Sequence, residues 1–456
     1  MGEASMTPAR ARAALDAEAR RTRRGSDLQR TADPRRHDDG RVTPDDAADD
    51  APGLWSWVVT AGPRREASPP GLPGALGSVA ALAARLWEAL RGRLPMLSPA
   101  LLTAPRDHWT AARLARRLRL GRVAGVERTT ADLLVVRTEP AGGAGAASAP
   151  GAVQHALKHP LSDRARAALR CETEVLALLS ADARIGTRWQ ALLPVSRVHR
   201  EGVAQAWLPG VPASAWTAAD PGAARRAGAH ALAAMEELHR RTGRHCPAGP
   251  YTASWVEPAV EVLRREVPAC RTPAGAAALA LLRGRLEDGL RAAGELRVGW
   301  THGDFHPGNV LLDPGGGEVT GVIDWVQSQR EGPTEVDPRM YAFALRHRLS
   351  GREFGLCVVD ALRAGGLTPE DRALLRGSGD ADAGAGAGRS ALDPAAEYAL
   401  TLLTWLWHVA GNAAKSRRFG RSHRWTARNV LPVLRELTQS QTPSAPSRPT
   451  GSPAAA

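Results

Sequence analysis

The sequence is poor in lysine and asparagine, and these shortages limit where certain chemistry can lie. Among the 60 lysines and arginines of the 456 residues, only two are lysines, Lys158 and Lys415. Where arginine is used almost everywhere, a lysine indicates a position that needs a compact ammonium and would not fit a planar guanidinium. Asparagine occurs only at positions 309, 412 and 429. Each of the two lysines is therefore expected to mark such a position.

Cysteine and long apolar runs are also scarce. The four cysteines show no paired spacing and no Cys-x-x-Cys pattern, which argues against a disulfide framework or a zinc site and suits a reducing compartment. No run of about 18 or more uncharged apolar residues occurs, and the N-terminus lacks the apolar region of a signal peptide. We therefore expect a soluble, cytoplasmic protein without membrane insertion.

Charge and composition allow several classes of protein. Lysine plus arginine number 60 against 47 aspartates plus glutamates, a net charge of +13, and 43% of the residues are hydrophobic. A positive balance of this size permits contact with nucleic acid or anionic lipid but requires neither. The basic residues are spread along the chain, which favours a solvated basic surface over specific nucleic-acid binding. The length allows two or three domains.

The most informative stretch runs from Trp300 to Trp325. Two short apolar runs, 310–312 and 319–323, flank Asp-Pro-Gly-Gly-Gly-Glu, which predicts a β-hairpin with a glycine loop. A turn centred near positions 315 and 316 places Asn309 opposite positions 322–324, within about a residue of Asp324.

This pairing brings together the parts that phosphoryl transfer requires. Opposed residues lie roughly 4.5–5.5 Å apart at Cβ, so the amide oxygen of Asn309 and the carboxylate of Asp324 can share a hard cation such as Mg²⁺, with substrate phosphates completing its shell. Asp304, on the irregular segment five residues before Asn309, can face an acceptor hydroxyl. The three residues thus supply one carboxylate base and two oxygen ligands for a metal, which are the parts that phosphoryl transfer requires. The alternative is a plain hairpin with polar ends.

These residues also carry a family resemblance. His302-x-Asp304, followed by Asn309 and then by Ile323-Asp324-Trp325, resembles the catalytic loop and metal-binding segment of the aminoglycoside phosphotransferase and choline kinase-like enzymes, relatives of protein kinases. The resemblance covers roughly residues 120–430. It implies an α+β, protein-kinase-like two-lobe fold, with a small antiparallel sheet and one helix in the N-lobe and a larger, mainly helical C-lobe. It also implies ATP and Mg²⁺, with Asp304 as the catalytic residue and Asn309 and Asp324 as metal ligands.

The region before residue 160 fits the N-lobe. Strands are predicted at 123–129, 132–137 and 153–158, the last ending at Lys158. In the resembling family, a lysine at the end of the third strand reaches the α and β phosphates of the nucleotide. The alternative is a solvent-exposed strand lysine.

A helix is predicted next, at 162–179, with Glu172 on its apolar face. A buried carboxylate needs a partner, and Lys158 is the natural candidate for the lysine–glutamate pair of kinase-like sites. Glu174 is expected to be solvated.

The segment from 190 to 210 predicts two more strands, 191–198 and 203–208, closed by Pro-Gly. Trp207 and Leu208 resemble the hinge of the family, where the backbone hydrogen-bonds the adenine edge. Trp207 fits either the core or a contact with the base. No GxGxxG motif is present where a nucleotide-covering loop is expected, which weakens the assignment of that loop.

From residue 211 we expect a helical C-lobe. Helices are predicted up to Leu238-His239 and then at 253–266, 276–293 and 394–416; the tryptophans of the last helix are expected in the core. His239 and His302 are interpreted as structural, and His306 as either structural or catalytic. Asp337 is expected to cap a helix or to brace a loop.

The predicted organisation has five parts. They are a disordered region at 1–70 with an apolar island at 54–59, a helical leader at 71–120 with helices near 75–92 and 107–119, an N-lobe for nucleotide binding at 121–210, a C-lobe for catalysis and acceptor binding at 211–436, and a disordered tail at 437–456.

The acceptor is the least determined part. Aminoglycosides are polycations, whereas residues 411–435 hold Lys415 and six arginines without an acid. If this segment borders the cleft, a neutral or anionic hydroxyl compound fits better; a solvated basic helix far from the cleft is the alternative. The sequence does not distinguish ATP from GTP and does not determine the oligomeric state.

We therefore expect an ATP-dependent phosphotransferase that acts on a hydroxyl of a small molecule, such as a sugar, a hydroxylated metabolite or an antibiotic. The alternatives are a catalytically inactive kinase-fold module that binds a nucleotide or a partner and, third, an arginine-rich nucleic-acid binder, which predicts steep salt dependence.

Overall fold

The computed structural model describes residues 105–140, 154–217, 220–376 and 392–439, all within one compact unit. Several predictions lie outside these residues: the disordered region at 1–70, the helix at 75–92 and the tail from residue 440 onward. The predicted start of that tail at 437 is wrong, because residues 437–439 are the end of a helix. No helix of the described residues is long and apolar enough to cross a membrane. The four cysteines are free thiols.

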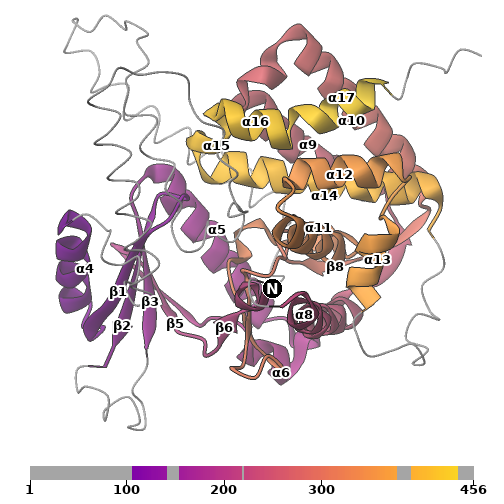
Figure 1. Cartoon of the computed structure of the whole chain (residues 1–456). Coiled ribbons are helices and arrows are strands. Elements are labelled where there is room, and N and C mark those ends of the chain that lie inside the picture. Colours follow the sequence, from indigo (N-terminus) through magenta and orange to yellow (C-terminus); the bar gives the residue numbers. More distant parts are fainter. Residues whose placement is uncertain (1–104, 141–153, 218–219, 377–391, 440–456) are drawn as a thin grey trace, which may run out of the picture. The chain divides into compact units, whose positions relative to one another are not determined.

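An antiparallel five-stranded sheet forms the N-lobe, in the order β1-β2-β3-β5-β4 (Figure 1). Its strands are β1 (Arg122–Arg128), β2 (Leu133–Glu139), β3 (His155–Pro160), β4 (Ser196–His199) and β5 (Gly202–Ala206). The three strands predicted before residue 160 are confirmed with ends shifted by one or two residues. The prediction of a strand over 191–198 is wrong in its first half, because α6 (Gly186–Ala191) and a turn occupy it. A short apolar run does not distinguish a strand from a buried turn by periodicity.

One helix covers each face of this sheet. On one face, α4 (Pro105–Arg117) packs against β1 and β2, and its Ala111 and Leu114 join Leu157 of β3 in a small core. On the other face, α5 (Asp163–Ser180) packs against β3 and β5. Its Glu172 contacts Lys158, the residue that follows Leu157 on β3. Since successive strand residues point to opposite faces, α4 and α5 cover opposite sides.

The C-lobe is mainly helical. Its principal helices are α8 (Pro221–Thr242), α9 (Gly249–Glu266), α10 (Pro273–Ala292), α11 (Val336–Ser350), α12 (Phe354–Arg363), α13 (Pro369–Arg376), α14 (Pro394–Lys415) and α17 (Leu431–Gln439). The shorter ones are α7 (Ser214–Thr217), α15 (Arg417–Arg421), α16 (His423–Asn429) and the 3₁₀ turns η4 (Ala183–Ile185), η5 (Pro268–Arg271) and η6 (Trp325–Gln327).

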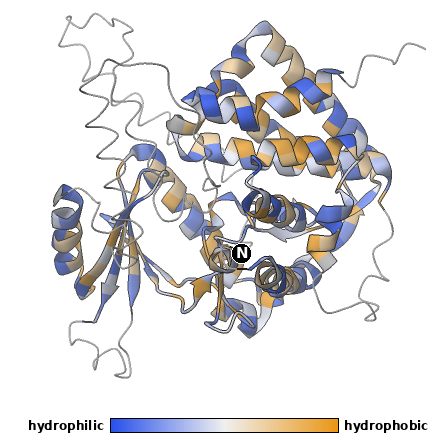
Figure 2. Ribbon diagram, viewed as in Figure 1, coloured by the Kyte–Doolittle hydropathy of each residue, from blue (hydrophilic) through white to orange (hydrophobic). Residues whose placement is uncertain are grey.

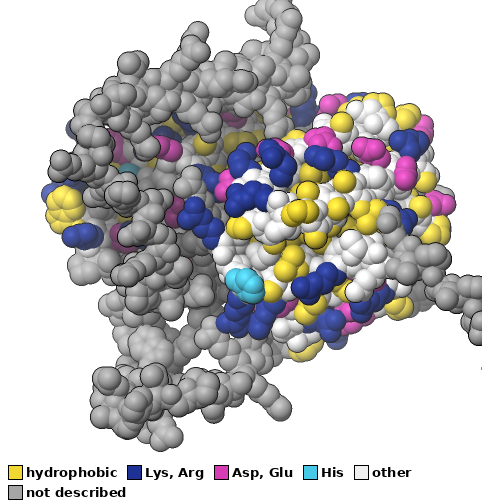
Figure 3. Space-filling model, turned by 90° about the horizontal axis from the view of Figure 1, so that it is seen from above, with side chains coloured by type: hydrophobic (Ala, Val, Ile, Leu, Met, Phe, Trp, Pro, Cys, Tyr) yellow, Lys and Arg dark blue, Asp and Glu magenta, His cyan; other side chains and the backbone are white. Residues whose placement is uncertain are grey.

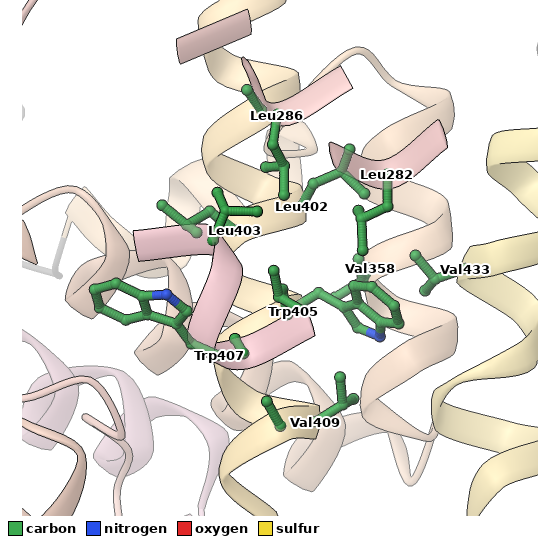
Figure 4. Close-up of a cluster of buried hydrophobic side chains, with 14 of the residues drawn as sticks. Leu282, Leu286, Val358, Leu402, Leu403, Trp405, Trp407, Val409 and Val433 are labelled. Atoms are coloured by element: carbon green, nitrogen blue, oxygen red, sulfur yellow. The ribbon is translucent and has the colours of Figure 1, made fainter. Parts of the chain in front are cut away.

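Helix α14 is the centre of the C-lobe. Figure 2 shows how hydrophobic it is, and Figure 4 shows Trp405 and Trp407 among aliphatic side chains of α10, α12 and α17. Both indoles are buried, and each donates its N–H to a backbone carbonyl, of Asn429 and of Trp255 respectively. The prediction that this tryptophan-rich helix belongs to the core is confirmed.

Two small sheets interrupt the helices, and the sequence did not predict all of their strands. One has the order β10-β9-β6 and the other β11-β8-β7. Their bounds are β6 (Val211–Pro212), β7 (Arg244–Pro247), β8 (Glu295–Thr301), β9 (Val310–Leu312), β10 (Val319–Val322) and β11 (Gln329–Pro333). The C-lobe is mainly helical, as expected, but β6, β7, β8 and β11 were not predicted. Strand β8 is buried on both faces along most of its length, so it lacks the alternation that reveals a half-exposed strand.

Candidate active site

The hairpin of β9 and β10 forms in the predicted register. Val310 pairs with Val322 and Leu312 with Val319, and the N–H of Ile323 donates to the carbonyl oxygen of Asn309 at 2.9 Å. Asn309 thus lies opposite position 323, next to Asp324. The turn is stabilised by the carboxylate of Asp313, which accepts the backbone N–H groups of positions 315, 317 and 318.

The carboxylate of Asp337 holds the start of the loop that runs from His302 to Asn309. This fully buried carboxylate accepts the N–H groups of His302 and Gly303 at 2.8 and 2.9 Å and lies 3.0 Å from Nε2 of His239. Gly303 has φ +76°, and a Cβ there would approach the carbonyl oxygen of Gln327 to 2.3 Å, so only glycine fits. Asp337 therefore braces the loop, the second of its two predicted roles.

Both histidines predicted to be structural hold this loop in place. Nε2 of His302 lies 2.9 Å from the carbonyl oxygen of Ile323, so it ties the loop to the end of β10. His239, at the end of α8, orients Asp337.

Replacing Asp337 by asparagine tests this brace. The amide offers one acceptor oxygen and turns its NH₂ toward one of the two backbone N–H groups, so the free energy of unfolding should fall by about 2 kcal/mol. A displacement of the loop should also lower kcat by about tenfold to a hundredfold, while nucleotide affinity is unchanged. Denaturant titration and steady-state kinetics measure both effects, with the exposed Asp288→Asn as control. Wild-type values for Asp337→Asn would contradict the brace.

The predicted lysine–glutamate pair is present in the N-lobe. Nζ of Lys158 lies 2.8 Å from both carboxylate oxygens of Glu172, which is buried on α5. Glu174 is exposed, as predicted. The buried carboxylate keeps the ammonium at the end of β3.

The segment predicted as a hinge links β5 to β6. Trp207 and Leu208 are half-buried, and the N–H of Trp207 donates to the carbonyl oxygen of Gln154 at 2.9 Å. The guanidinium of Arg137 lies 5.7 Å from the centre of the Trp207 ring. Since the N–H of Trp207 is engaged, a ligand at this edge would meet the backbone of Leu208 first.

The sequence analysis did not place Lys415, at the C-terminal end of α14, at this site. Its Nζ lies 2.6 Å from Oδ2 of Asp304 and 3.2 Å from Oδ2 of Asp324. Asp304 is buried, whereas the side chain of Asp324 is 38% exposed. The signal in the sequence was its rarity, since the only other lysine is Lys158.

The ammonium and the two carboxylates shift one another's pKa. Burial alone would raise the pKa of Asp304, but the charge and hydrogen bond of Lys415 hold it well below its usual range. The pKa of Asp324 is lowered against burial by Lys415 and then by Lys158. Burial would lower the pKa of Lys415, but the two carboxylates raise it above its usual range. Both acids are therefore ionised at neutral pH, as a base and a metal ligand need to be.

The donor set fits a magnesium site completed by substrate. Nδ2 of Asn309 donates to the backbone carbonyl of Asp304 at 3.0 Å, which leaves Oδ1 as its ligand atom. Asp324, in the left-handed conformation at φ 64°, supplies a partly exposed carboxylate. No group of three or more His, Cys, Asp or Glu side chains suited to a metal occurs in the described ranges. Two oxygens are few for a protein-only site but suit Mg²⁺ that also binds phosphates.

The basic segment 411–435 is divided between the site and the surface. Arg164 of α5 donates to the carbonyls of Ala413 and Ala414, and so holds the end of α14 from which Lys415 extends. Arg428 pairs with Glu353 away from the hairpin. On the face shown in Figure 3, lysines and arginines are interspersed with acidic and hydrophobic side chains. Lys415 thus lies at the candidate site, whereas the side chain of Arg428 is 46% exposed.

A cavity lies beside the loop, lined by His306, His347, Arg348, Phe354 and His408 and by the apolar Met340 and Ala344. Burial lowers the pKa of His306 to about 4 and that of His408 to about 3, so both imidazoles are neutral at pH 7. His306 lies two residues from Asp304 on the same loop. The cavity therefore borders the side of the loop that carries the candidate base.

Comparison with known proteins identifies a family for this chain. A model of the phosphotransferase enzyme family (APH) matches residues 146–377, a little more than half of the chain. No curated protein matches the sequence significantly.

Several solved structures resemble the chain. An aminoglycoside-3′-phosphotransferase of type VIII is 22% identical, with 65% of this chain and 98% of that chain covered and a TM-score of 0.40. Macrolide 2′-phosphotransferase MphH from Brachybacterium faecium is 16% identical, with coverage of 75% and 99% and a TM-score of 0.41. Aminoglycoside phosphotransferase APH(3″)-Id from Streptomyces rimosus, in complex with ADP and streptomycin, is 21% identical, with coverage of 64% and 98% and a TM-score of 0.38.

The family model spans the lysine–glutamate pair, the braced loop and the hairpin, and the described fold has the sheet-containing and helical lobes expected of a kinase-like protein. The chain belongs to the phosphotransferase enzyme family and is a kinase-like phosphotransferase.

Proposed function

We propose that the protein transfers the γ-phosphate of ATP to a hydroxyl group of a small molecule. The observation that carries this proposal is the convergence of Asp304 and Asp324 on one cation, the ammonium of Lys415 at 2.6 and 3.2 Å. A base and a metal-binding carboxylate must lie this close if one is to face the acceptor and the other the phosphates.

Each candidate residue then has a defined role. Lys158, oriented by Glu172, binds the nucleotide phosphates, and the backbone at Trp207 and Leu208 binds the adenine edge. Asn309 and Asp324 would hold Mg²⁺, which neutralises phosphate charge when bound. Asp304 accepts or orients the proton of the acceptor hydroxyl. In this proposal nucleotide binding belongs to residues 121–210 and catalysis to residues 211–436.

Replacing Lys158 by alanine tests the nucleotide role. Loss of a charge-assisted contact typically costs about 1.5–3 kcal/mol, so the Kd of ATP should rise by about tenfold or more. Equilibrium binding of ATP with Mg²⁺ measures it, and Arg170→Ala, an exposed cation on α5, is the control. Equal affinities in both variants and the wild type would show that Lys158 does not contact the nucleotide.

A screen for Mg²⁺-dependent release of ADP tests the activity itself. Aminoglycosides, a macrolide, neutral sugars and sugar phosphates should be compared side by side. The similar solved structures are named as phosphotransferases of aminoglycosides or macrolides, so the two sugar classes extend the screen beyond them. We expect polycationic aminoglycosides to be poor acceptors, since Asp304 already faces the ammonium of Lys415. No release above background with any acceptor would contradict the proposed activity.

One observation favours a second candidate, a catalytically inactive nucleotide-binding module. Lys415 holds both carboxylates, as a bound cation would. In that case Mg²⁺ would neither stabilise the protein nor support ADP release.

A further inference from the structure

The cavity beside the catalytic loop is lined by nitrogen donors and by no acid. Its volume is about 10 Å³, room for about one oxygen atom of a water or of an anion that reaches in, and its polar lining consists of His306, His347, Arg348 and His408. The nearby carboxylate Asp304 is already engaged by Lys415. The kind of ligand that this cavity could bind depends on its ring and guanidinium nitrogens, namely on which of them carry a proton and have no hydrogen-bond acceptor.

His408 presents a donor without an acceptor. It is 5% exposed, and its ring stacks on Phe354 with centroids 3.8 Å apart, which fixes the ring plane. Nδ2 of Asn412 donates to its Nε2 at 3.1 Å, so the proton of the neutral ring lies on Nδ1. That Nδ1 is buried and has no hydrogen-bond partner among the described residues.

Arg348 presents a second donor and a charge. Its Nη1 donates to Oγ1 of Thr217 at 3.3 Å, whereas Nη2 is enclosed and has no partner within the described ranges. No carboxylate of the described residues forms an ion pair with it, and burial lowers the pKa of its guanidinium to about 10. Arg348 as a whole is half-buried, but the enclosed end of its guanidinium lacks a counter-charge, which is unfavourable, so an anion would complete this site.

His306 adds a third donor. Its Nδ1 accepts the N–H of Gly308 at 3.0 Å, so the proton of the neutral ring is on Nε2. His306 lies two residues from Asp304 on the same loop. The donors therefore stand beside the place where the acceptor hydroxyl must lie.

We propose that this cavity is an oxyanion subsite of the acceptor, so that the acceptor is a hydroxyl compound that also carries a phosphate or a carboxylate. The inference rests on the proposed function and specifies its substrate class. The donors of Arg348, His408 and His306 bind the anionic oxygens. The apolar walls from Met340, Ala344 and Phe354 exclude water and strengthen those contacts.

A trapped water does not serve as well. One water could accept from one or two of these donors, but it would leave the charge of Arg348 uncompensated. If the cavity binds an anion, removing the charge of Arg348 should abolish stabilisation by phosphate. If it holds only a water, phosphate should stabilise neither form.

The first test uses inorganic phosphate as the probe on the whole protein, with ADP and Mg²⁺ present in excess to fill the nucleotide site. Phosphate should raise the midpoint of thermal unfolding of the wild type and of the control Arg372→Gln, an exposed arginine on α13. It should have no effect on Arg348→Met. Without phosphate, Arg348→Met should be at least as stable as the wild type, because it removes an uncompensated charge. No stabilisation of the wild type, or equal stabilisation of Arg348→Met, would overturn the subsite.

The second test compares a neutral hexose, its phosphate and its uronic acid as acceptors. The anionic acceptors should have a kcat/KM about tenfold or more higher in the wild type. Arg348→Met should lose that preference through KM, with kcat changed by less than about threefold. His408→Phe retains the stacking on Phe354 and should lose part of the preference for anionic acceptors. A preference that survives in Arg348→Met would overturn the subsite.

The two tests separate this inference from the proposed function. Absence of ADP release with every acceptor would refute the activity, while the phosphate experiment would still decide whether the cavity binds an oxyanion. Equal use of neutral and anionic acceptors would refute the subsite and leave the activity established.

Discussion

Asp304→Ala should lower kcat by about 10²–10⁴-fold, the usual contribution of a general base, while the Kd of ATP with Mg²⁺ changes by less than about threefold. The reason is position. Asp304 is buried on the braced loop and bonded to Lys415, whereas the nucleotide phosphates are assigned to Lys158, Asn309 and Asp324. Single-turnover kinetics and equilibrium nucleotide binding measure the two quantities separately.

The control for this experiment is Glu318→Ala, which removes an exposed acid from the hairpin that follows the loop. It should leave kcat and the Kd of ATP unchanged. If Asp304→Ala reduced nucleotide affinity as much as turnover, Asp304 would belong to the nucleotide site and the proposed role would be wrong.

Lys415→Met should destabilise the protein when Mg²⁺ is absent, because it leaves two carboxylates near each other without a cation. Removing one partner of a buried pair costs about 3–5 kcal/mol, and the partial exposure of Asp324 reduces this to about 2 kcal/mol. Denaturant unfolding in EDTA measures the loss. Mg²⁺ should then stabilise Lys415→Met more than the wild type, since it no longer competes with an ammonium.

The same variant should shift the pH dependence of turnover. Without Lys415, burial dominates and the pKa of Asp304 rises, so the carboxylate takes up a proton at a higher pH. The acidic limb of the kcat/KM profile should therefore move to higher pH than in the wild type.

Lys415→Arg separates charge from shape. It keeps the cation but replaces a compact ammonium by a planar guanidinium, so stability in EDTA should be largely retained while turnover falls. Equal effects of Mg²⁺ on the wild type and Lys415→Met would contradict competition at this site. A wild type that Mg²⁺ does not stabilise at all would favour the inactive module.

The parts predicted correctly depend on short-range rules. The hairpin register follows from turn length, which relates positions close in sequence. The pairing of Lys158 with Glu172 followed from the need of a buried acid for a partner on the adjacent strand. Asp337 was expected either to cap a helix or to brace a loop, and only the packing of α11 under the loop decided between the two.

The parts that were missed depend on segments far apart in the chain. Strands β7 and β11 are short, and β8 is mostly buried, so no periodicity marked them. Lys415 stood out only by its rarity, and its contact with Asp304 spans 111 positions. Arg348, His306 and His408 come from α11, the loop and α14, and nothing in their spacing brings them together.

The sequence by itself therefore determined the family, the two-lobe fold class and the set of reactive groups, because local spacing encodes the hairpin, the loop and the lysine–glutamate pair. Only the tertiary structure decided what surrounds those groups. The end of α14 is brought to the loop by core packing around Trp405 and by Arg164, and these contacts place one ammonium between two carboxylates. That packing determines which charges meet at the acceptor side, and no pattern of neighbouring residues in the sequence predicts them.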